Sequence, residues 1–298
     1  MTGSAKAARR AAVLGSPIAH SLSPALHLAA YQALGLDGWQ YSKAEMTEAD
    51  LPGFLQSIRV TQSAADPESN SQLPWAGLSL TMPLKHAVLG LVDFVEPLAK
   101  AVGAANTVIV SRAGLTAANS DVYGIVAAIR ETAPNQELQT AAILGGGATA
   151  ASSLAALAEL GIKDPEVYVR SLERSRGVAM AAARLHVEPV FRKLSPATRL
   201  DAITADVVIS TLPAHAADWL APEAGGAASA AMTVPTGRQR VLLDAAYEPW
   251  PSRLATVWAG GGGLVASGKL MLLHQAALQV QMMTGYAAPI AAMRQAID

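Results

Sequence analysis

The sequence predicts an α/β fold in two domains. The chain has 298 residues, and domains commonly hold roughly 100–200 residues each. Short apolar segments of strand length alternate with longer segments of helical pattern, which is typical of parallel strands joined by right-handed crossovers. Hydrophobic residues make up 51% of the chain and charged residues 15%, a globular composition. The first expectation is therefore two packed domains, each built around a sheet.

The N-terminal half reads as an α/β domain of its own. Its strand candidates lie at residues 11–14, 39–45, 75–80, 106–110 and 115–118. Ser23 is expected to cap a helix that has Pro24 at its first position and stops at Gly35. The polar, breaker-rich residues 61–74 are expected to form a surface loop.

The C-terminal half repeats the alternation of strand and helix more regularly. Strand candidates lie at residues 141–144, 166–169, 207–210 and 241–243, and helix candidates at 150–160 and 175–185. A long helix is expected at 269–284, followed by a short one that ends near Ile297. This half predicts a parallel, Rossmann-like sheet.

Charge and composition exclude several classes of function. The net charge of −1 gives no basic excess for nucleic acid or an anionic membrane. The chain has no cysteine, which rules out disulfides, thiolate zinc sites and a cysteine nucleophile. Neither a secretory signal nor an apolar run long enough for a transmembrane helix is evident. We therefore expect a cytoplasmic protein that acts on a small molecule, without a metal.

A glycine-rich turn follows the apolar segment 141–144. Residues 145–150 read G-G-G-A-T-A, which fits the dinucleotide pattern G-x-G-x-x-A. Small residues let the backbone approach a pyrophosphate, and a helix N-terminus supplies N–H groups to it. A tight strand-to-helix turn without a ligand is the alternative, but the surrounding alternation favours nucleotide binding.

The end of the next strand indicates which nucleotide. Many NAD-binding folds place an acidic residue there to hold the ribose 2′-hydroxyl, whereas a 2′-phosphate needs cations. Arg170 and Arg174 stand at this point, with Glu173 between them. The pattern favours NADP; the alternative is a pair of solvated loop arginines.

Short polar islands interrupt the apolar N-terminal half. Ser21 and Ser23 place two hydroxyls at a helix N-terminus, which is suited to an anion, although plain helix capping would explain them too. Lys85 follows a strand, Asn106 heads another, and Asp121 follows a third. Taken singly, each is equally consistent with a surface lysine or a turn cap.

Seven short motifs occur along the chain in the order that is typical of one known enzyme family. They are G-S-P-I-A-H-S-L-S-P at 15–24, L-T-M-P-L-K at 80–85, G-A-A-N-T at 103–107, N-S-D-V-Y-G at 119–124, the glycine turn at 145–150, D-A-A-Y-E-P-W-P at 244–251 and G-K-L-M-L-L-H-Q-A at 268–276. Through these motifs, which are spread over nearly its whole length, the sequence resembles the shikimate dehydrogenase family.

The resemblance implies a role for each motif. Ser21 and Ser23, with Tyr247, would hold a substrate carboxylate, and the ring hydroxyls would be contacted by Thr81, Asn106, Asp121 and Gln275. Lys85 and Asp121 would form the catalytic pair, with Lys85 either carrying the proton or acting by electrostatic positioning. The cofactor contacts would be Gly145, Gly146, Gly147, Ala148, Thr149, Ala150, Arg170, Ser171, Arg174, Thr211 and Gly268.

The resemblance also implies an organisation. Residues 1–121, completed by the C-terminal helices in 259–298, would bind substrate, residues 122–258 would bind NADP, and the active site would lie in the cleft between the two domains. The expected reaction is the reversible reduction of 3-dehydroshikimate to shikimate in aromatic amino-acid biosynthesis. An NAD-preferring quinate/shikimate dehydrogenase is the nearest alternative, and a non-catalytic sensing module is a second. The sequence does not determine the oligomeric state; a homodimer is one possibility.

Four positions depart from the family pattern. Ser79 stands where the family usually has Asn, Val169 where it often has Asn, and Ala148 replaces a commoner Gly. Residues 209–213 read I-S-T-L-P in place of Asn-Ala-Thr-Ser. The last three concern the cofactor and leave the expected reaction unchanged.

Overall fold

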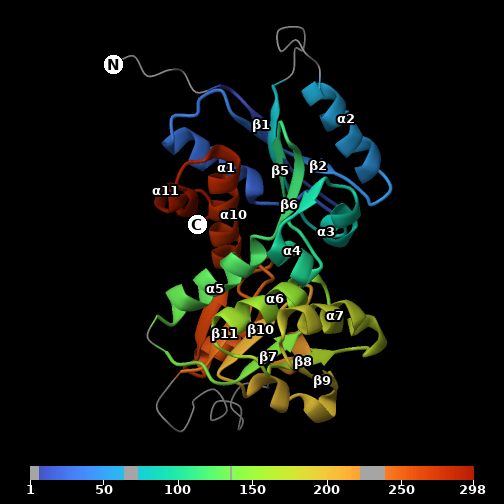
Figure 1. The fold of residues 1–298 in the computed structure, drawn as a ribbon. Helices are drawn as coiled ribbons and strands as arrows, with labels where there is room; N and C mark the ends of the chain where they lie inside the picture. Colours follow the sequence, from blue (N-terminus) through green and yellow to red (C-terminus); the bar gives the residue numbers. More distant parts are fainter. Residues whose placement is uncertain (1–6, 64–72, 135, 222–238) are drawn as a thin grey trace. The chain divides into compact units, whose positions relative to one another are not determined.

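The computed structural model describes residues 7–63, 73–134, 136–221 and 239–298. The chain divides into two compact units, drawn in Figure 1. The first unit comprises Met1–Lys100, Ala104–Ser120 and Gln275–Asp298. The second comprises Ala101–Gly103 and Asp121–His274. Each unit has its own six-stranded sheet, as the two-domain α/β prediction requires.

The sheet of the first unit is mixed. Its strands are β1 (Arg10–Gly15), β2 (Gln40–Glu45), β3 (Trp75–Leu80), β4 (Phe94–Val95), β5 (Thr107–Ser111) and β6 (Gly114–Ala118). Their order across the sheet is β2-β1-β3-β5-β6-β4. β1 is parallel to both of its neighbours, whereas β5 is antiparallel to β3 and β6. The carboxyl ends of β1, β3 and β6 therefore meet the amino end of β5 at one edge.

Helices cover both faces of this sheet. They are α1 (Ser23–Ala33), α2 (Leu51–Ser63), the short α3 (Leu84–Ala87) and α4 (Pro97–Val102), and α11 (Ile290–Gln295). Leu14 of β1 packs with Leu55 of α2 in one core, and Val13 packs with Tyr31 of α1 in the other. Successive side chains of a strand point to opposite faces, so one apolar strand serves both cores.

The start of α1 differs from the expectation. Ser23 is the first helical residue, not the cap; Leu22 holds the cap position and makes no side-chain hydrogen bond to the helix. Ser21 lies nearer that role, because its Oγ is 3.4 Å from the backbone N of Ser23. The predicted stop is confirmed, since Gly35 adopts a φ of +62°.

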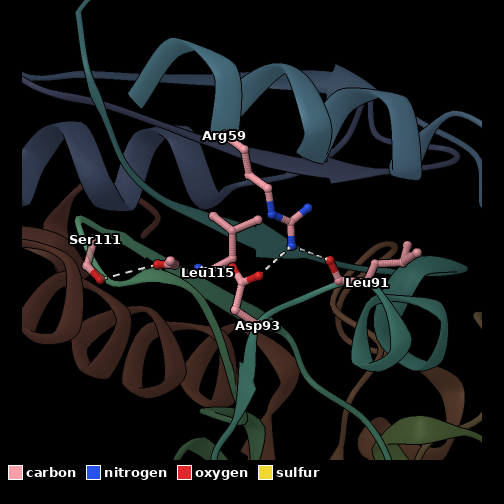
Figure 2. Close-up of polar contacts among 6 residues, drawn as sticks. Arg59, Leu91, Asp93, Ser111 and Leu115 are labelled. Atoms are coloured by element: carbon pink, nitrogen blue, oxygen red, sulfur yellow. Dashed lines mark hydrogen bonds and ion pairs between the residues drawn. The ribbon is translucent and has the colours of Figure 1, made fainter. Parts of the chain in front are cut away.

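A carboxylate ties the outer part of this sheet together (Figure 2). Asp93 accepts a hydrogen bond from the backbone N–H of Leu115 at 2.7 Å and pairs with Arg59 of α2 at 3.2 Å. The same guanidinium donates to the carbonyl of Leu91 at 2.8 Å. The Leu115 N–H, more than any other donor, lowers the pKa of Asp93. These contacts anchor α2 beside β4 and β6.

The second unit has the predicted parallel sheet. Its strands are β7 (Ala141–Leu144), β8 (Glu166–Val169), β9 (Val190–Lys193), β10 (Val207–Ser210), β11 (Val241–Asp244) and β12 (Leu264–Ser267). Their order, β12-β11-β10-β7-β8-β9, is that of a doubly wound dinucleotide-binding sheet. From β7 the chain adds strands toward one edge of the sheet (β8, β9) and then from β10 toward the other edge (β11, β12). A ligand is expected at the switch point between β7 and β10.

Helices lie on this sheet as the alternation requires. They are α5 (Asp121–Thr132), α6 (Ala148–Glu159), α7 (Arg176–Leu185) and α9 (Arg253–Gly260). The fully buried Trp258 of α9 packs with Leu144, Val208 and Leu242 beneath the central strands. The predicted segments 141–144, 166–169 and 207–210 are confirmed residue for residue.

The long helix near the C-terminus is divided between the two units. α10 (Gly268–Thr284) begins in the second unit and continues in the first from Gln275 onward. The expected boundary at residue 258 falls short, because β12 pairs with β11 and extends the second sheet. The prediction that the final helices return to the first unit is confirmed. No helix in the described ranges is long and apolar enough to cross a membrane.

Candidate functional site

The predicted polar residues of the first unit follow the strand ends at one edge of its sheet. The Thr81 N–H, just past β3, donates to the carbonyl of Leu14 at 2.9 Å. The Ser16 N–H, just past β1, donates to the Met82 carbonyl at 2.8 Å. The backbone carbonyl of Asn106, just before β5, accepts from the Leu80 N–H at 2.7 Å. The sheet therefore gathers motifs that are far apart in sequence.

Ser21 and Ser23 lie together at the start of α1. Ser21 is half-buried, and Ser23 is only 4% exposed. The hydroxyl of Tyr41, from β2, donates to Ser79 Oγ at 2.6 Å. Burial raises the pKa of Tyr41, so its hydroxyl stays neutral. An anion at this helix end would meet the two hydroxyls of Ser21 and Ser23.

Lys85 is held by its backbone on the short helix α3. The Lys85 carbonyl accepts from the Ala105 N–H at 2.8 Å, which ties α3 to the segment that leads into β5. The turn before it closes when the Leu84 N–H donates to the Thr81 carbonyl at 2.9 Å. Lys85 and Thr81 are both half-buried. The predicted ammonium and hydroxyl thus come from a single fixed turn.

Asn106 and Gln275 are brought together although 169 residues separate them. The Asn106 Nδ2 donates to Gln275 Oε1 at 3.1 Å and to Ser120 Oγ at 2.9 Å. The Asn106 Oδ1 accepts from the Ser120 backbone N–H at 2.8 Å. A substrate hydroxyl that binds the Asn106 amide must share or replace one of these bonds. Ser120 was not among the predicted site residues, although it lies inside the N-S-D motif.

Asp121 directly follows this cluster. It is the first residue of α5 and is 4% exposed. The Ser120 N–H bond to Asn106 fixes the backbone immediately before it. A carboxylate in the first turn of a helix is favoured by the helix dipole. Local structure thus places the Asp121 side chain in the first turn of α5, at the start of the second unit.

The second unit has a hollow at its switch point. Its volume is about 480 Å³, and its lining includes Gly145, Gly146 and Gly147 after β7, Arg170 and Ser171 after β8, and Thr211 after β10. Val169, Ser175, Leu212 and Pro213 also line it, and none of the four was among the predicted cofactor residues. The sequence signal that could have identified these residues is their position, because each lies at the end of a predicted strand, just after one, or at the start of a predicted helix.

The glycine turn suits a pyrophosphate. A Cβ on Gly145 would lie 2.2 Å from Thr211 Oγ1, and the φ of Gly145 is +124°. Gly147 caps α6 without a side-chain hydrogen bond, and nothing lies within 4 Å of the position its Cβ would take. Ala148, Thr149 and Ala150 form the first turn of α6, where backbone N–H groups have no carbonyl partner within the helix. The residues present therefore fit a dinucleotide phosphate.

The other predicted cofactor residues differ in how they are placed. Arg170 is exposed at the rim of the hollow, whereas the side chain of Arg174 lies outside the described part of the structure. Thr211 Oγ1 donates to the Leu144 carbonyl at 2.9 Å and so braces β10 against β7. A Cβ on Gly268 would lie 2.3 Å from the Ala245 carbonyl oxygen, which gives this glycine a packing role.

Tyr247 belongs to the second unit, unlike the two serines with which it was grouped. Its side chain is half-buried. Burial raises the pKa of Tyr247 above its usual value, and the nearby Glu248 raises it further. The Tyr247 hydroxyl is therefore a neutral hydrogen-bond donor near neutral pH. Within the described ranges no cluster of three His or acidic side chains is placed to hold a metal ion.

A substitution tests whether the turn at Gly145 is strained for other residues. Gly145→Ala should lower the free energy of unfolding by about 1–3 kcal/mol, because an L side chain disfavours this φ and its Cβ would meet Thr211. Thermal unfolding measures the loss. Gly147→Ala is the matched control, since its Cβ enters open space. Equal melting temperatures for the two variants would contradict the argument.

Two family models match the chain. Residues 13–108 match the model described as "Shikimate dehydrogenase substrate binding domain". Residues 270–297 match the "Shikimate 5'-dehydrogenase C-terminal domain". Both matches fall largely within the first unit.

Curated relatives extend the similarity to nearly the whole chain. A protein named "Shikimate dehydrogenase (NADP(+))" from Cereibacter sphaeroides is 33% identical over 289 residues, covering 90% of this chain and 88% of the relative. A Thermus thermophilus protein of the same name is 33% identical and covers 93% and 92%. The chain belongs to the shikimate dehydrogenase family. The recognition from seven motifs is thereby confirmed.

Solved structures of shikimate dehydrogenases share this fold. That of Mycobacterium tuberculosis has a TM-score of 0.80 and 38% identity, and covers 97% of this chain and 98% of its own. That of Thermus thermophilus, described as a complex with NADP(H) and shikimate, has a TM-score of 0.75 and 28% identity, covering 97% and 98%. The two-domain α/β prediction thus agrees with the architecture of the shikimate dehydrogenase family.

Proposed function

We propose that the protein is a shikimate dehydrogenase that interconverts 3-dehydroshikimate and shikimate with NADP. The observation that carries the proposal is the hollow at the β7–β10 switch point, bounded by the glycine turn and Arg170, in a chain of this family. Relatives that cover about nine-tenths of the chain are named for NADP and shikimate. Retention of Lys85 and Asp121 disfavours a pure sensor, which needs no proton carrier.

Residues of the first unit supply most of the substrate contacts in this proposal, and Tyr247 and Asp121 of the second unit supply the others. Ser21 and Ser23 would hold the carboxylate, with Tyr247 as a third hydroxyl. Thr81, Asn106 and Gln275 would meet ring hydroxyls, with Asp121 beside them. The bond between Asn106 and Gln275 supports their shared role, because both amides are already fixed at the same strand edge.

The chemistry divides between cofactor and protein. NADP, when bound, would supply or accept the hydride. Lys85 or Asp121 would give a proton to the carbonyl oxygen during reduction and take it from the hydroxyl during oxidation. Thr149 and the other first-turn N–H groups of α6 would hold the pyrophosphate, and Arg170, with Ser171 and Arg174, the 2′-phosphate.

A kinetic comparison tests the proposal. The purified protein is assayed with shikimate or quinate and with NADP or NAD, and the absorbance of the reduced nicotinamide is followed. The highest kcat/KM is expected for shikimate with NADP. Absence of turnover with shikimate and either cofactor would contradict the proposed function. A preference for quinate and NAD would favour the quinate/shikimate dehydrogenase alternative.

A further variant tests carboxylate binding at the start of α1. Ser21→Ala should weaken shikimate binding by about 1–3 kcal/mol, the range for hydrogen bonds to a charged group. The KM for NADP should be unchanged, since Ser21 lies in the first unit and the hollow in the second. Ser57→Ala, on the exposed face of α2, is the matched control. A variant that loses NADP affinity but keeps that for shikimate would refute the assignment.

A further inference from the structure

A continuous chain of buried hydrogen bonds runs through the first unit behind Asn106 and Gln275. Its centre is Gln279, a residue of α10 that is 1% exposed. Gln279 lies one helical turn after Gln275, so both amides project from the same side of the helix. The function proposed above gives Gln279 no role. The directions of the hydrogen bonds in this chain can be assigned from two backbone groups.

The first backbone group is the N–H of Ser120. An N–H can only donate, so the atom of the Asn106 amide that lies 2.8 Å from it is the oxygen Oδ1. The Asn106 Nδ2 therefore faces the other way and donates to Gln275 Oε1 at 3.1 Å. In consequence Gln275 turns its oxygen toward Asn106 and its Nε2 away from it.

The second backbone group is the carbonyl of Asn106. A carbonyl can only accept, so the Gln279 atom 3.1 Å from it is Nε2. The same Nε2 donates to Thr107 Oγ1 at 2.9 Å. The single hydroxyl proton of Thr107 is then left for Asn106 Oδ1, 2.9 Å away. Gln279 thus directs a second donor onto the oxygen that Ser120 already holds.

The far side of Gln279 fixes its own orientation. Its Oε1 accepts from Ser79 Oγ at 2.7 Å, and Ser79 Oγ accepts from the Tyr41 hydroxyl at 2.6 Å. His27 Nε2, from α1, lies 3.4 Å from the same Oε1. Burial lowers the pKa of His27 to about 3, and Tyr41 stays neutral, so no charge disturbs the chain. Ser79, a departure from the family pattern, is thereby tied in as the partner of Gln279.

We propose that Gln279 is a positioning residue that sets the donor direction of the substrate site. Through Thr107 and the Asn106 backbone it holds the Asn106 amide in one orientation, and Asn106 in turn makes Gln275 present an N–H. The substrate atom opposite Gln275 must then be an acceptor, such as a hydroxyl oxygen. This inference rests on the proposed function, because it assumes that Gln275 faces shikimate.

Removing the Gln279 amide tests the proposal. Gln279→Met keeps the length of the side chain but loses its donor and acceptor. The KM for shikimate should rise about tenfold, because Gln275 would no longer be held with its N–H toward the substrate and roughly one hydrogen bond would be lost. The KM for NADP should stay at the wild-type value, since its hollow lies in the second unit. Circular dichroism and thermal unfolding establish that the variant is folded.

An isosteric variant separates donor direction from packing. In Gln279→Glu the introduced carboxyl can donate to the Asn106 carbonyl only when it is protonated. Burial raises the pKa of such a carboxyl. The titratable groups that face it are His27 from α1 and Tyr41 from β2, with Tyr31 behind His27. All three are neutral in the wild type; the introduced carboxyl and His27 would titrate as a coupled pair.

The pH dependence follows from the sign of that shift. The ratio of the shikimate KM of Gln279→Glu to that of the wild type should be high near about pH 9 and fall toward one near about pH 6, as the carboxyl gains its proton. Gln279→Met should give a ratio that does not change with pH. Gln281→Glu, the same change on the exposed side of α10, is the matched control and should behave as wild type.

The outcomes separate this inference from the proposed function. If the wild type turns over shikimate but Gln279→Met has its normal KM, the positioning role is refuted. It is refuted also if Gln279→Glu has the same KM ratio at both ends of the pH range. Should the Glu variant fail to fold, Gln279→Met and the isosteric Thr107→Val decide, because Thr107→Val breaks the same relay and should raise the KM too. A wild type without activity would instead refute the proposed function.

Discussion

Lys85→Ala and Asp121→Asn should each lower turnover of shikimate by about 10²-fold or more, the usual scale for a positioned acid–base group. The reaction oxidises an alcohol, and the cofactor carries only the hydride, so the hydroxyl proton has to leave through the protein. Lys85 sits on a turn fixed by Ala105. Asp121 follows a backbone fixed by Asn106. Turnover is measured at saturating shikimate and NADP.

The double variant shows whether the two residues act in one step. If they do, Lys85→Ala combined with Asp121→Asn should be little worse than either change alone. Lys163→Ala is the matched control for loss of an exposed lysine and should leave turnover unchanged. Near-normal turnover of Lys85→Ala would remove Lys85 from the mechanism. Thermal unfolding of Asp121→Asn checks that α5 keeps its first turn.

Arg170→Ala should raise the KM for NADP by about tenfold or more, since hydrogen bonds between charged groups contribute roughly 1.5–3 kcal/mol. The KM for NAD should barely change, because NAD has no 2′-phosphate for the guanidinium to meet. Arg170 lines the hollow directly after β8, where a doubly wound sheet places the ribose. Both constants are measured by varying each cofactor at saturating shikimate.

High salt and the removal of a nearby charge give two further tests of cofactor binding. Arg170 is exposed, so high salt should narrow the preference for NADP over NAD. Glu173→Gln should leave NADP binding unchanged or improve it, because it removes a like charge near the phosphate. Arg130→Ala, at an exposed ion pair on α5, is the matched control. A wild type that uses NAD as efficiently as NADP would refute the arginine interpretation and favour the quinate/shikimate dehydrogenase alternative.

The sequence by itself determined much of the second unit and the identity of the polar motifs. Strands such as 207–210, and 166–169 after its first residue Glu166, are short and buried on both faces, so composition marks them. The glycine turn was recognisable because the backbone that Gly145 adopts favours glycine over any residue with a Cβ. Ser21, Lys85, Asn106 and Asp121 were found as polar islands between apolar segments. Their grouping needed the family resemblance.

Tertiary structure alone decided how the polar side chains are paired and directed. Ser120 and Gln279 were missed because their hydrogen-bond partners lie close in space but far along the chain: Gln279 Nε2 meets Thr107 across 172 residues. The cap of α1 was misread for a related reason, since the backbone at Ser23 is already helical. Apolar periodicity predicts which face is buried. Which atom of an amide donates depends on backbone groups that only the folded chain brings beside it.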